Sequence, residues 1–133
     1  MKGFSEIDYN HGIQKERAIL PIIKRYFDRN IELVDNQYSK FDFKDDKGNF
    51  YELKSRRNKK SKYPTTLMPC SKVLKNNDNQ IYFVFSFDDE LCYIKYNEEQ
   101  FAKYDRKIFC REYGYTEQDY FYIPIADLQT IPV

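Results

Sequence analysis

The stretch Lys40–Lys54 (KFDFKDDKGNFYELK) predicts a β-hairpin, and the rest of the chain is organised around it. Its apolar and polar residues alternate, which is typical of strands that bury one face. We expect the turn at residues 46–48, where Gly48 would supply the left-handed residue of a three-residue loop. The alternation assigns four apolar residues to one face, namely Phe41, Phe43, Tyr51 and Leu53.

The opposite face of this hairpin would carry Asp42, Glu52 and Lys54. The predicted register places Asp42 directly opposite Glu52, with their β-carbons roughly 5 Å apart. Two facing carboxylates destabilise a sheet unless a positive charge lies between them. A divalent metal is the natural candidate for that charge, since hard cations take oxygen ligands.

Asp42, a nine-residue gap and then Glu52-Leu53-Lys54 resemble the D…(D/E)xK signature of the PD-(D/E)XK nuclease superfamily. The proline of the family name is absent, because Phe41 precedes Asp42. The resemblance implies an α/β fold with a restriction-endonuclease-like core, a mixed β-sheet flanked by helices on both faces, similar to small Holliday-junction-resolvase-type members. It covers about residues 10–87 of a single domain, 1–133, with 88–133 as a C-terminal elaboration.

The resemblance also implies roles for individual residues. Asp42 and Glu52, with the carbonyl of Leu53, would hold Mg²⁺, for which Mn²⁺ could substitute. Lys54 would position or activate the attacking water. The implied function is a metal-dependent nuclease that hydrolyses phosphodiester bonds, in particular a DNA endonuclease. Nucleic acid, and DNA first, is therefore the expected partner, and a homodimer is compatible with this interpretation.

Residues 8–28 are predicted to form an amphipathic helix, and Glu16 lies near the middle of its apolar face. A lone carboxylate there is costly unless it is paired or bound to a metal. Many PD-(D/E)XK enzymes place a first-helix glutamate at the active site, so the resemblance adds Glu16 to the catalytic residues. Pro21 leaves an alternative open, since a helix that begins near this proline would leave Glu16 in a loop.

The net charge is only +1, so any affinity for nucleic acid must come from local segregation of charge. Six of the nine residues from Lys54 to Lys62 are basic, and they follow the strand expected to carry the site. Such a run is also typical of a solvated loop. The predicted phosphate-contacting residues are Arg56, Arg57, Lys59, Lys60 and Lys62, together with Lys72 from a later segment.

Beyond the hairpin, strands are predicted at 31–34, 81–87, 91–96 and 120–125, and a short second helix could begin near Thr66 or Ser71. The chain has no twenty-residue apolar run and no apolar N-terminal segment. We therefore expect a soluble intracellular protein, cytoplasmic or associated with nucleic acid, that has no membrane partner.

The three cysteines and the single histidine are interpreted as non-catalytic. Cys70, Cys92 and Cys110 are widely spaced and are expected to be reduced thiols. His11 is expected at the surface near the start of a helix, with a role as general base as the alternative.

Two other functions remain open from the sequence. The first is a non-catalytic nucleic-acid-binding module, which would keep the fold and the basic loop but lack tight binding of a divalent metal. The second is a protein-interaction domain, in which the carboxylates are ordinary surface charge and nucleic acid does not bind even at low salt.

Overall fold

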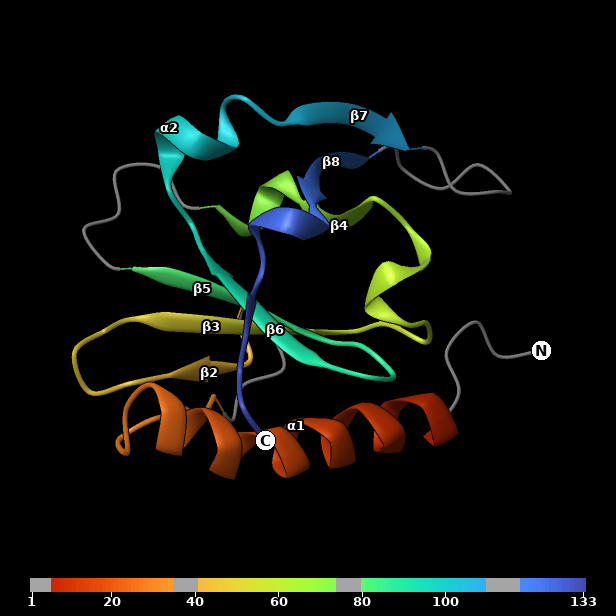
Figure 1. The fold of residues 1–133 in the computed structure, drawn as a ribbon. Coiled ribbons are helices and arrows are strands. Elements are labelled where there is room, and N and C mark those ends of the chain that lie inside the picture. Colours follow the sequence, from red (N-terminus) through yellow and green to blue (C-terminus); the bar gives the residue numbers. More distant parts are fainter. Residues whose placement is uncertain (1–5, 35–40, 74–79, 110–117) are drawn as a thin grey trace.

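The chain folds into an α/β structure of one long helix and two β-sheets, described here from a computed structural model (Figure 1). The structure describes residues 6–34, 41–73, 80–109 and 118–133, with all of their side chains except those of 6–13, 108–109 and 118. The side chain of His11 and all of Cys110 lie outside this description, as does Lys40, the start of the first strand of the predicted hairpin. Cys70 and Cys92 are free thiols.

The larger sheet has six strands in the order β1-β2-β3-β5-β6-β9. The first three form an antiparallel meander, β5 lies parallel to β3, and β6 and β9 continue antiparallel. The predicted mixed sheet is therefore confirmed. Its strands are β1 (Glu32–Leu33), β2 (Phe43–Lys44), β3 (Phe50–Ser55), β5 (Ile81–Ser86), β6 (Leu91–Lys95) and β9 (Gln129–Thr130).

Helix α1 (Glu6–Tyr26) covers one face of this sheet (Figure 1). Ile19 and Ile23 are buried on its inner side, in a core that includes Tyr51 and Val84 from the sheet. Pro21 lies inside the helix on its exposed side, where its ring does not disturb the packing. The alternative start of the helix near Pro21 is therefore wrong, and Glu16 lies on the helix.

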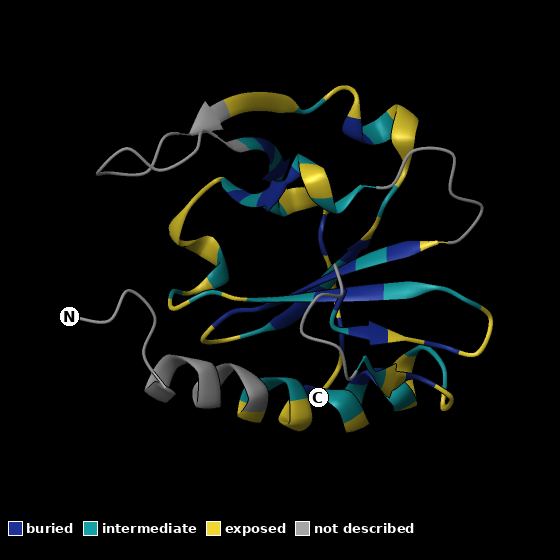
Figure 2. Ribbon diagram, turned by 180° about the vertical axis from the view of Figure 1, so that it is seen from behind, coloured by how far each residue is buried: buried dark blue, intermediate teal, exposed yellow. Residues whose placement is uncertain are grey.

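The other face of the six-stranded sheet is covered by a second sheet, in which three antiparallel strands have the order β4-β8-β7. Apolar side chains from both sheets, among them Met68, Phe83, Phe85 and Ile123, fill the space between them. Figure 2 shows buried residues in strands of both sheets. The strands of the second sheet are β4 (Thr65–Pro69), β7 (Asp105–Phe109) and β8 (Gln118–Pro124).

The predicted flanking helix on this second face does not occur in the described part of the chain. Residues 65–69 are strand β4, because two β-branched threonines favour a strand and Pro69 would interrupt a helix. The remaining elements are short. They are η1 (Lys60–Lys62), η2 (Cys70–Lys72), α2 (Glu98–Phe101) and η3 (Ile125–Asp127).

The turn of the hairpin is formed as predicted, with Gly48 at a φ of 84°. Asp45 holds it together, since its buried carboxylate accepts bonds from the amides of Lys47 and Asn49, both at 2.9 Å, and from the Tyr51 hydroxyl at 3.0 Å. Burial alone would raise the pKa of Asp45, but these hydrogen bonds lower it below its ordinary value. The hairpin is thus fixed independently of any ligand.

Helix α1 is long, but it is not apolar enough to cross a membrane, and the same holds for each other helix in the described part of the chain.

Candidate active site

A bulge in the hairpin positions Asp42. Phe43 is paired with Tyr51, and the amide of Asp42 also donates to the Tyr51 carbonyl, at 3.1 Å. Asp42 and Phe43 therefore both lie opposite Tyr51, which is the pattern of a β-bulge. The predicted regular register, with Asp42 directly opposite Glu52, is wrong at this point. The prediction that Phe41 and Phe43 lie on the same face of the hairpin is also wrong. Phe41 packs between the two sheets, whereas Phe43 packs against α1.

The Asp42 carboxylate nevertheless lies among the residues predicted to act with it. Its Oδ2 accepts a hydrogen bond from the Leu53 amide at 2.8 Å, which aims the side chain at β3. It is also the hydrogen-bond partner of two other carboxyl groups, those of Glu16 on α1 and Glu52 on β3. Three acidic side chains from three separate segments are thus brought together around Asp42.

This arrangement shifts the titration of both glutamates. Burial raises the pKa of Glu52 to about 8, and the hydrogen bond and negative charge of Asp42 act in the same direction, while Lys72 opposes them. Burial followed by the same two effects of Asp42 raises the pKa of Glu16 to about 8 as well. Two carboxyl groups share a hydrogen bond only when one of them is protonated. Burial and Asp42 thus favour the protonated form of both glutamates, whereas Lys72 favours the ionised form of Glu52.

Lys72 supplies a positive charge to this cluster. Its Nζ lies 2.5 Å from Oε2 of Glu52, a side chain that is only 4% exposed. At this distance the ammonium favours the ionised form of Glu52, against the effects of burial and Asp42. Lys72 was predicted to contact phosphate, and the structure places it on Glu52, from the short turn η2.

Lys54 lies two residues beyond Glu52 on β3 and is half-buried. Burial lowers the pKa of Lys54, and the positive charges of Lys72 and Arg56 lower it further, against the opposing effect of Glu52 and Asp42. A lysine of lowered pKa gives up its proton more readily than an exposed one. Lys54 is therefore suited to proton transfer or to hydrogen bonding with a reacting water.

The six predicted phosphate contacts divide into two groups. Arg56 is bonded internally, through Nε to Thr66 Oγ1 at 3.1 Å and through Nη2 to the Leu67 carbonyl at 2.5 Å. Lys60 lies 3.7 Å from Glu90, measured from Nζ to Oε1. Lys72 contacts Glu52. The more exposed group is Arg57, Lys59 and Lys62.

The carboxyl oxygens of the cluster are the type of donor atom that hard divalent cations take. Three carboxyl groups contribute such atoms, and Lys72 contacts Oε2 of Glu52. In the described part of the chain, however, no group of three or more His, Cys, Asp or Glu side chains is placed so that it could hold a metal ion. Lys72 occupies part of the space next to Glu52, so a cation would have to take the place of its ammonium group.

Beside the carboxylates lies a pocket of about 740 Å³, between the end of β3 and the second sheet. Lys54 and Lys72 line it, and Lys72 also contacts Glu52 of the cluster. It is also lined by Tyr63, Tyr120 and Tyr122. None of these tyrosines was predicted as a site residue. Tyr63 directly follows the basic run that ends at Lys62, whereas Tyr120 and Tyr122 come from the distant strand β8.

Comparisons of the chain with family models, curated proteins and solved structures found no match. Function is therefore inferred from the chemistry of the site. The fold brings together four of the residues predicted from the sequence, Glu16, Asp42, Glu52 and Lys54, and it adds Lys72 to them.

Proposed function

We propose that the protein is a divalent-metal-dependent nuclease that hydrolyses phosphodiester bonds, acting on DNA as an endonuclease. The observation that supports this proposal is the convergence of Glu16, Asp42 and Glu52, from three segments, next to Lys54. Gathering carboxylates in a partly buried place is unfavourable by itself. A site that binds a cation and a phosphate gives this arrangement a function.

In this proposal Asp42 and Glu52 would hold Mg²⁺, or Mn²⁺ in its place, with the carbonyl of Leu53 as a further oxygen ligand and Glu16 completing the set. The bound cation would lower the pKa of water and neutralise charge on the phosphate. Lys54 would orient the attacking water and stabilise the negative charge that develops on the phosphate oxygens. Arg57, Lys59 and Lys62 would contact flanking phosphates without reading sequence.

Loading the site requires two changes in the metal-free structure. Glu16 and Glu52 must release the protons that their raised pKa values retain, so metal affinity should increase with pH up to about 8. Lys72 must also leave Glu52, since its ammonium lies 2.5 Å from a ligand oxygen.

The Lys72–Glu52 ion pair favours a second candidate function, a non-catalytic nucleic-acid-binding module. A lysine that neutralises Glu52 lets the carboxylate be buried without a metal. In that case Lys72 is a permanent part of the structure and no divalent cation binds.

One assay separates the two candidates. The protein is incubated with single-stranded, duplex and four-way-junction DNA in Mg²⁺, Mn²⁺ or EDTA, next to the Glu16→Gln and Glu99→Gln variants. The nuclease predicts products with either metal and none in EDTA, with at least about tenfold slower cleavage by Glu16→Gln and a parental rate for Glu99→Gln. Glu99 is an exposed residue of α2 and serves as the matched control. Binding without cleavage in every metal would contradict the nuclease and support the module.

A further inference from the structure

The pocket next to Lys54 and Lys72 has two kinds of lining, one cationic and one aromatic and apolar. Its cationic side chains are Lys54, Arg56, Lys60 and Lys72, and no Asp or Glu of the described residues lines it. Its volume of about 740 Å³ is in the range of sites that bind small molecules. The positive lining therefore selects an anionic ligand of limited size.

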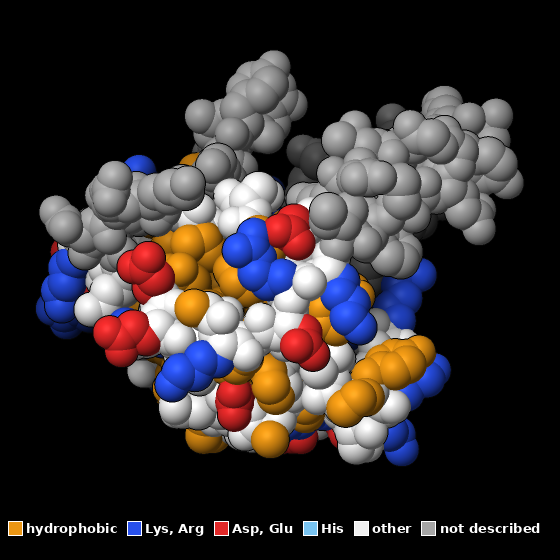
Figure 3. Space-filling model, turned by 90° about the horizontal axis from the view of Figure 1, so that it is seen from above, with side chains coloured by type: hydrophobic (Ala, Val, Ile, Leu, Met, Phe, Trp, Pro, Cys, Tyr) orange, Lys and Arg blue, Asp and Glu red, His pale blue; other side chains and the backbone are white. Residues whose placement is uncertain are grey.

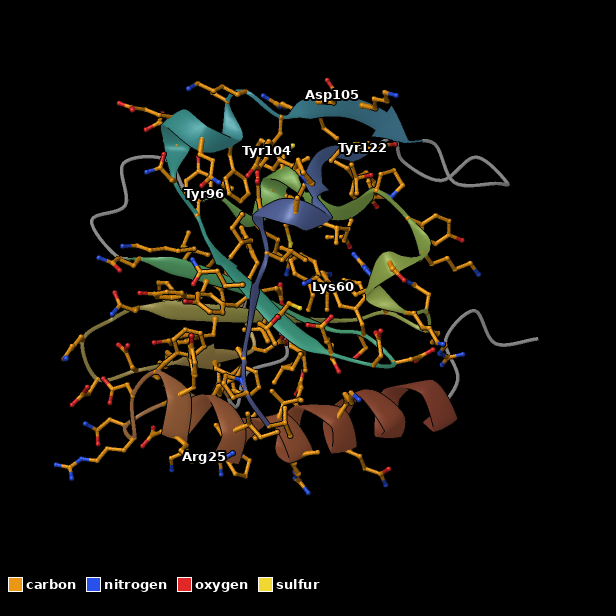
Figure 4. All side chains as sticks on the ribbon, viewed as in Figure 1. Arg25, Lys60, Tyr96, Tyr104, Asp105 and Tyr122 are labelled. Carbon is orange, nitrogen blue, oxygen red and sulfur yellow. The ribbon has the colours of Figure 1, made fainter. Side chains whose placement is uncertain are left out.

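The remaining lining is aromatic and apolar. Tyr63 stands at the surface with 54% of its area exposed, whereas Tyr122 on β8 is half-buried. Figure 4 shows Tyr122 on the second sheet and Lys60 on the side of the six-stranded sheet, so that the pocket lies between them. Lys62 adds a cation at the rim, with its Nζ 5.5 Å from the centre of the Tyr63 ring. A ligand with a flat ring and a phosphate matches both kinds of lining.

We propose that this pocket binds one unpaired nucleotide of a nucleic-acid strand, with its base against Tyr63 and Tyr122 and its phosphate toward Lys54 and Lys72. In a duplex each base is stacked between its neighbours, so only an unpaired base can offer its ring face to a tyrosine. The substrate would then be single-stranded or contain an unpaired position next to the bond that is cut. The position of the cut rests on the proposed nuclease function, but binding in the pocket does not.

Binding is measured in EDTA, which prevents cleavage, by fluorescence anisotropy with a labelled single-stranded 12-mer and with the same sequence as a blunt duplex. Tyr63→Ala, which removes an exposed ring, should weaken binding of the single strand about tenfold and change duplex binding less than about twofold. Tyr63→Phe keeps the ring and should bind as the parent does. The matched control is Tyr26→Ala on α1, which removes a 41% exposed tyrosine outside the pocket.

A competition arm with free dAMP distinguishes a nucleotide within a strand from a free nucleotide. Displacement of the 12-mer only at far higher dAMP concentration supports the proposal, whereas dAMP binding as tightly as the 12-mer overturns it. Equal losses for Tyr63→Ala and Tyr26→Ala, or no loss for either, also overturn it.

The proposed function can fail separately from this inference. Metal-dependent cleavage by the parent, together with unchanged binding by Tyr63→Ala, would contradict nucleotide binding in the pocket and support the nuclease. Binding that depends on Tyr63, without cleavage in Mg²⁺ or Mn²⁺, would support the pocket and contradict the nuclease.

Discussion

Burial and the neighbouring Asp42 carboxyl raise the pKa of Glu52 from an ordinary value of 4.5 to about 8. A folded-state pKa above the unfolded one means that the folded chain binds the proton more tightly. The stability that this group contributes is therefore complete below about pH 4.5 and is lost as the pH rises through about 8. The pKa of Glu16 is also raised in the folded protein, so this residue contributes to the same pH dependence of stability.

In EDTA, the melting temperature of the parent should consequently fall as the pH rises from about 5 to about 8. Glu52→Gln should fall less steeply, because an amide does not titrate, and should melt no lower than the parent at pH 8. Differential scanning fluorimetry across a pH series makes the comparison, with Glu99→Gln as the control that keeps the parental slope. Identical slopes for the parent and Glu52→Gln would show that Glu52 does not carry the shifted proton.

At the scale of residues, the sequence predicted which carboxylates meet but not how. Glu52 and Lys54 share a strand face by simple alternation, and Glu16 is conspicuous as a carboxylate on an apolar helix face. The bulge at Asp42 could not be predicted, because alternation assumes an unbroken ladder. The ion pair of Lys72 was missed because it depends on where the chain returns after β4.

At the scale of elements, the connection between β3 and β5 is the main departure from the predicted core. Parallel strands need a crossover, which is usually a helix. Here the chain passes through η1, β4 and η2, and β4 joins a second sheet. The meander and the central strand were predictable because their apolar patterns are strong. The second sheet was not, since it pairs β4 with β8, more than fifty residues later in the chain.

Arg56 is the side chain that ties this crossover to β3, because it bonds Thr66 and Leu67 of β4 from the end of the β3 segment. Arg56→Met keeps an apolar stem but loses both bonds, so it should destabilise the fold by about 1–3 kcal/mol. Chemical denaturation of the folded protein measures this change.

The control for this change is Arg106→Met, whose partner Asp119 lies at the exposed side of the second sheet, and its stability should change little. If Arg56→Met were as stable as the parent and instead flattened the salt dependence of DNA binding, Arg56 would be a phosphate contact after all.

At the scale of the whole molecule, charge is distributed unevenly although the net charge is only +1. Figure 3 shows acidic, basic and apolar side chains interspersed over the part of the second-sheet face that is described. Exposed basic residues instead gather in the loop after β3, and a second group lines a hollow on the outer side of α1. Figure 4 shows Arg25 of that second group pointing away from the sheets.

The salt dependence of binding distinguishes these two surfaces. Each phosphate contact adds about 0.9 to the slope of log affinity against log salt on duplex DNA and about 0.7 on a single strand. Replacing Lys59 and Lys62 together by Ala should flatten the slope by up to ~2, whereas the matched pair Lys24→Ala and Arg25→Ala should leave it unchanged. Titrations across a salt series in Ca²⁺ give both slopes. If only the Lys24→Ala and Arg25→Ala pair flattened the slope, the phosphate-binding surface would lie on α1 rather than in the loop after β3.

The central claim is that Glu52 belongs to a metal-dependent catalytic site, and the cleavage rate of Glu52→Gln at saturating DNA and Mg²⁺ tests it most directly. Glu52→Gln removes a ligand of the cation that would stabilise charge in the transition state, so it should slow cleavage at least about 100-fold. Each factor of ten in rate corresponds to about 1.36 kcal/mol of activation free energy. Circular dichroism should show an unchanged fold, and Glu99→Gln should cleave at the parental rate. The account predicts that loss, and a folded Glu52→Gln protein that cleaves as fast as the parent would contradict it.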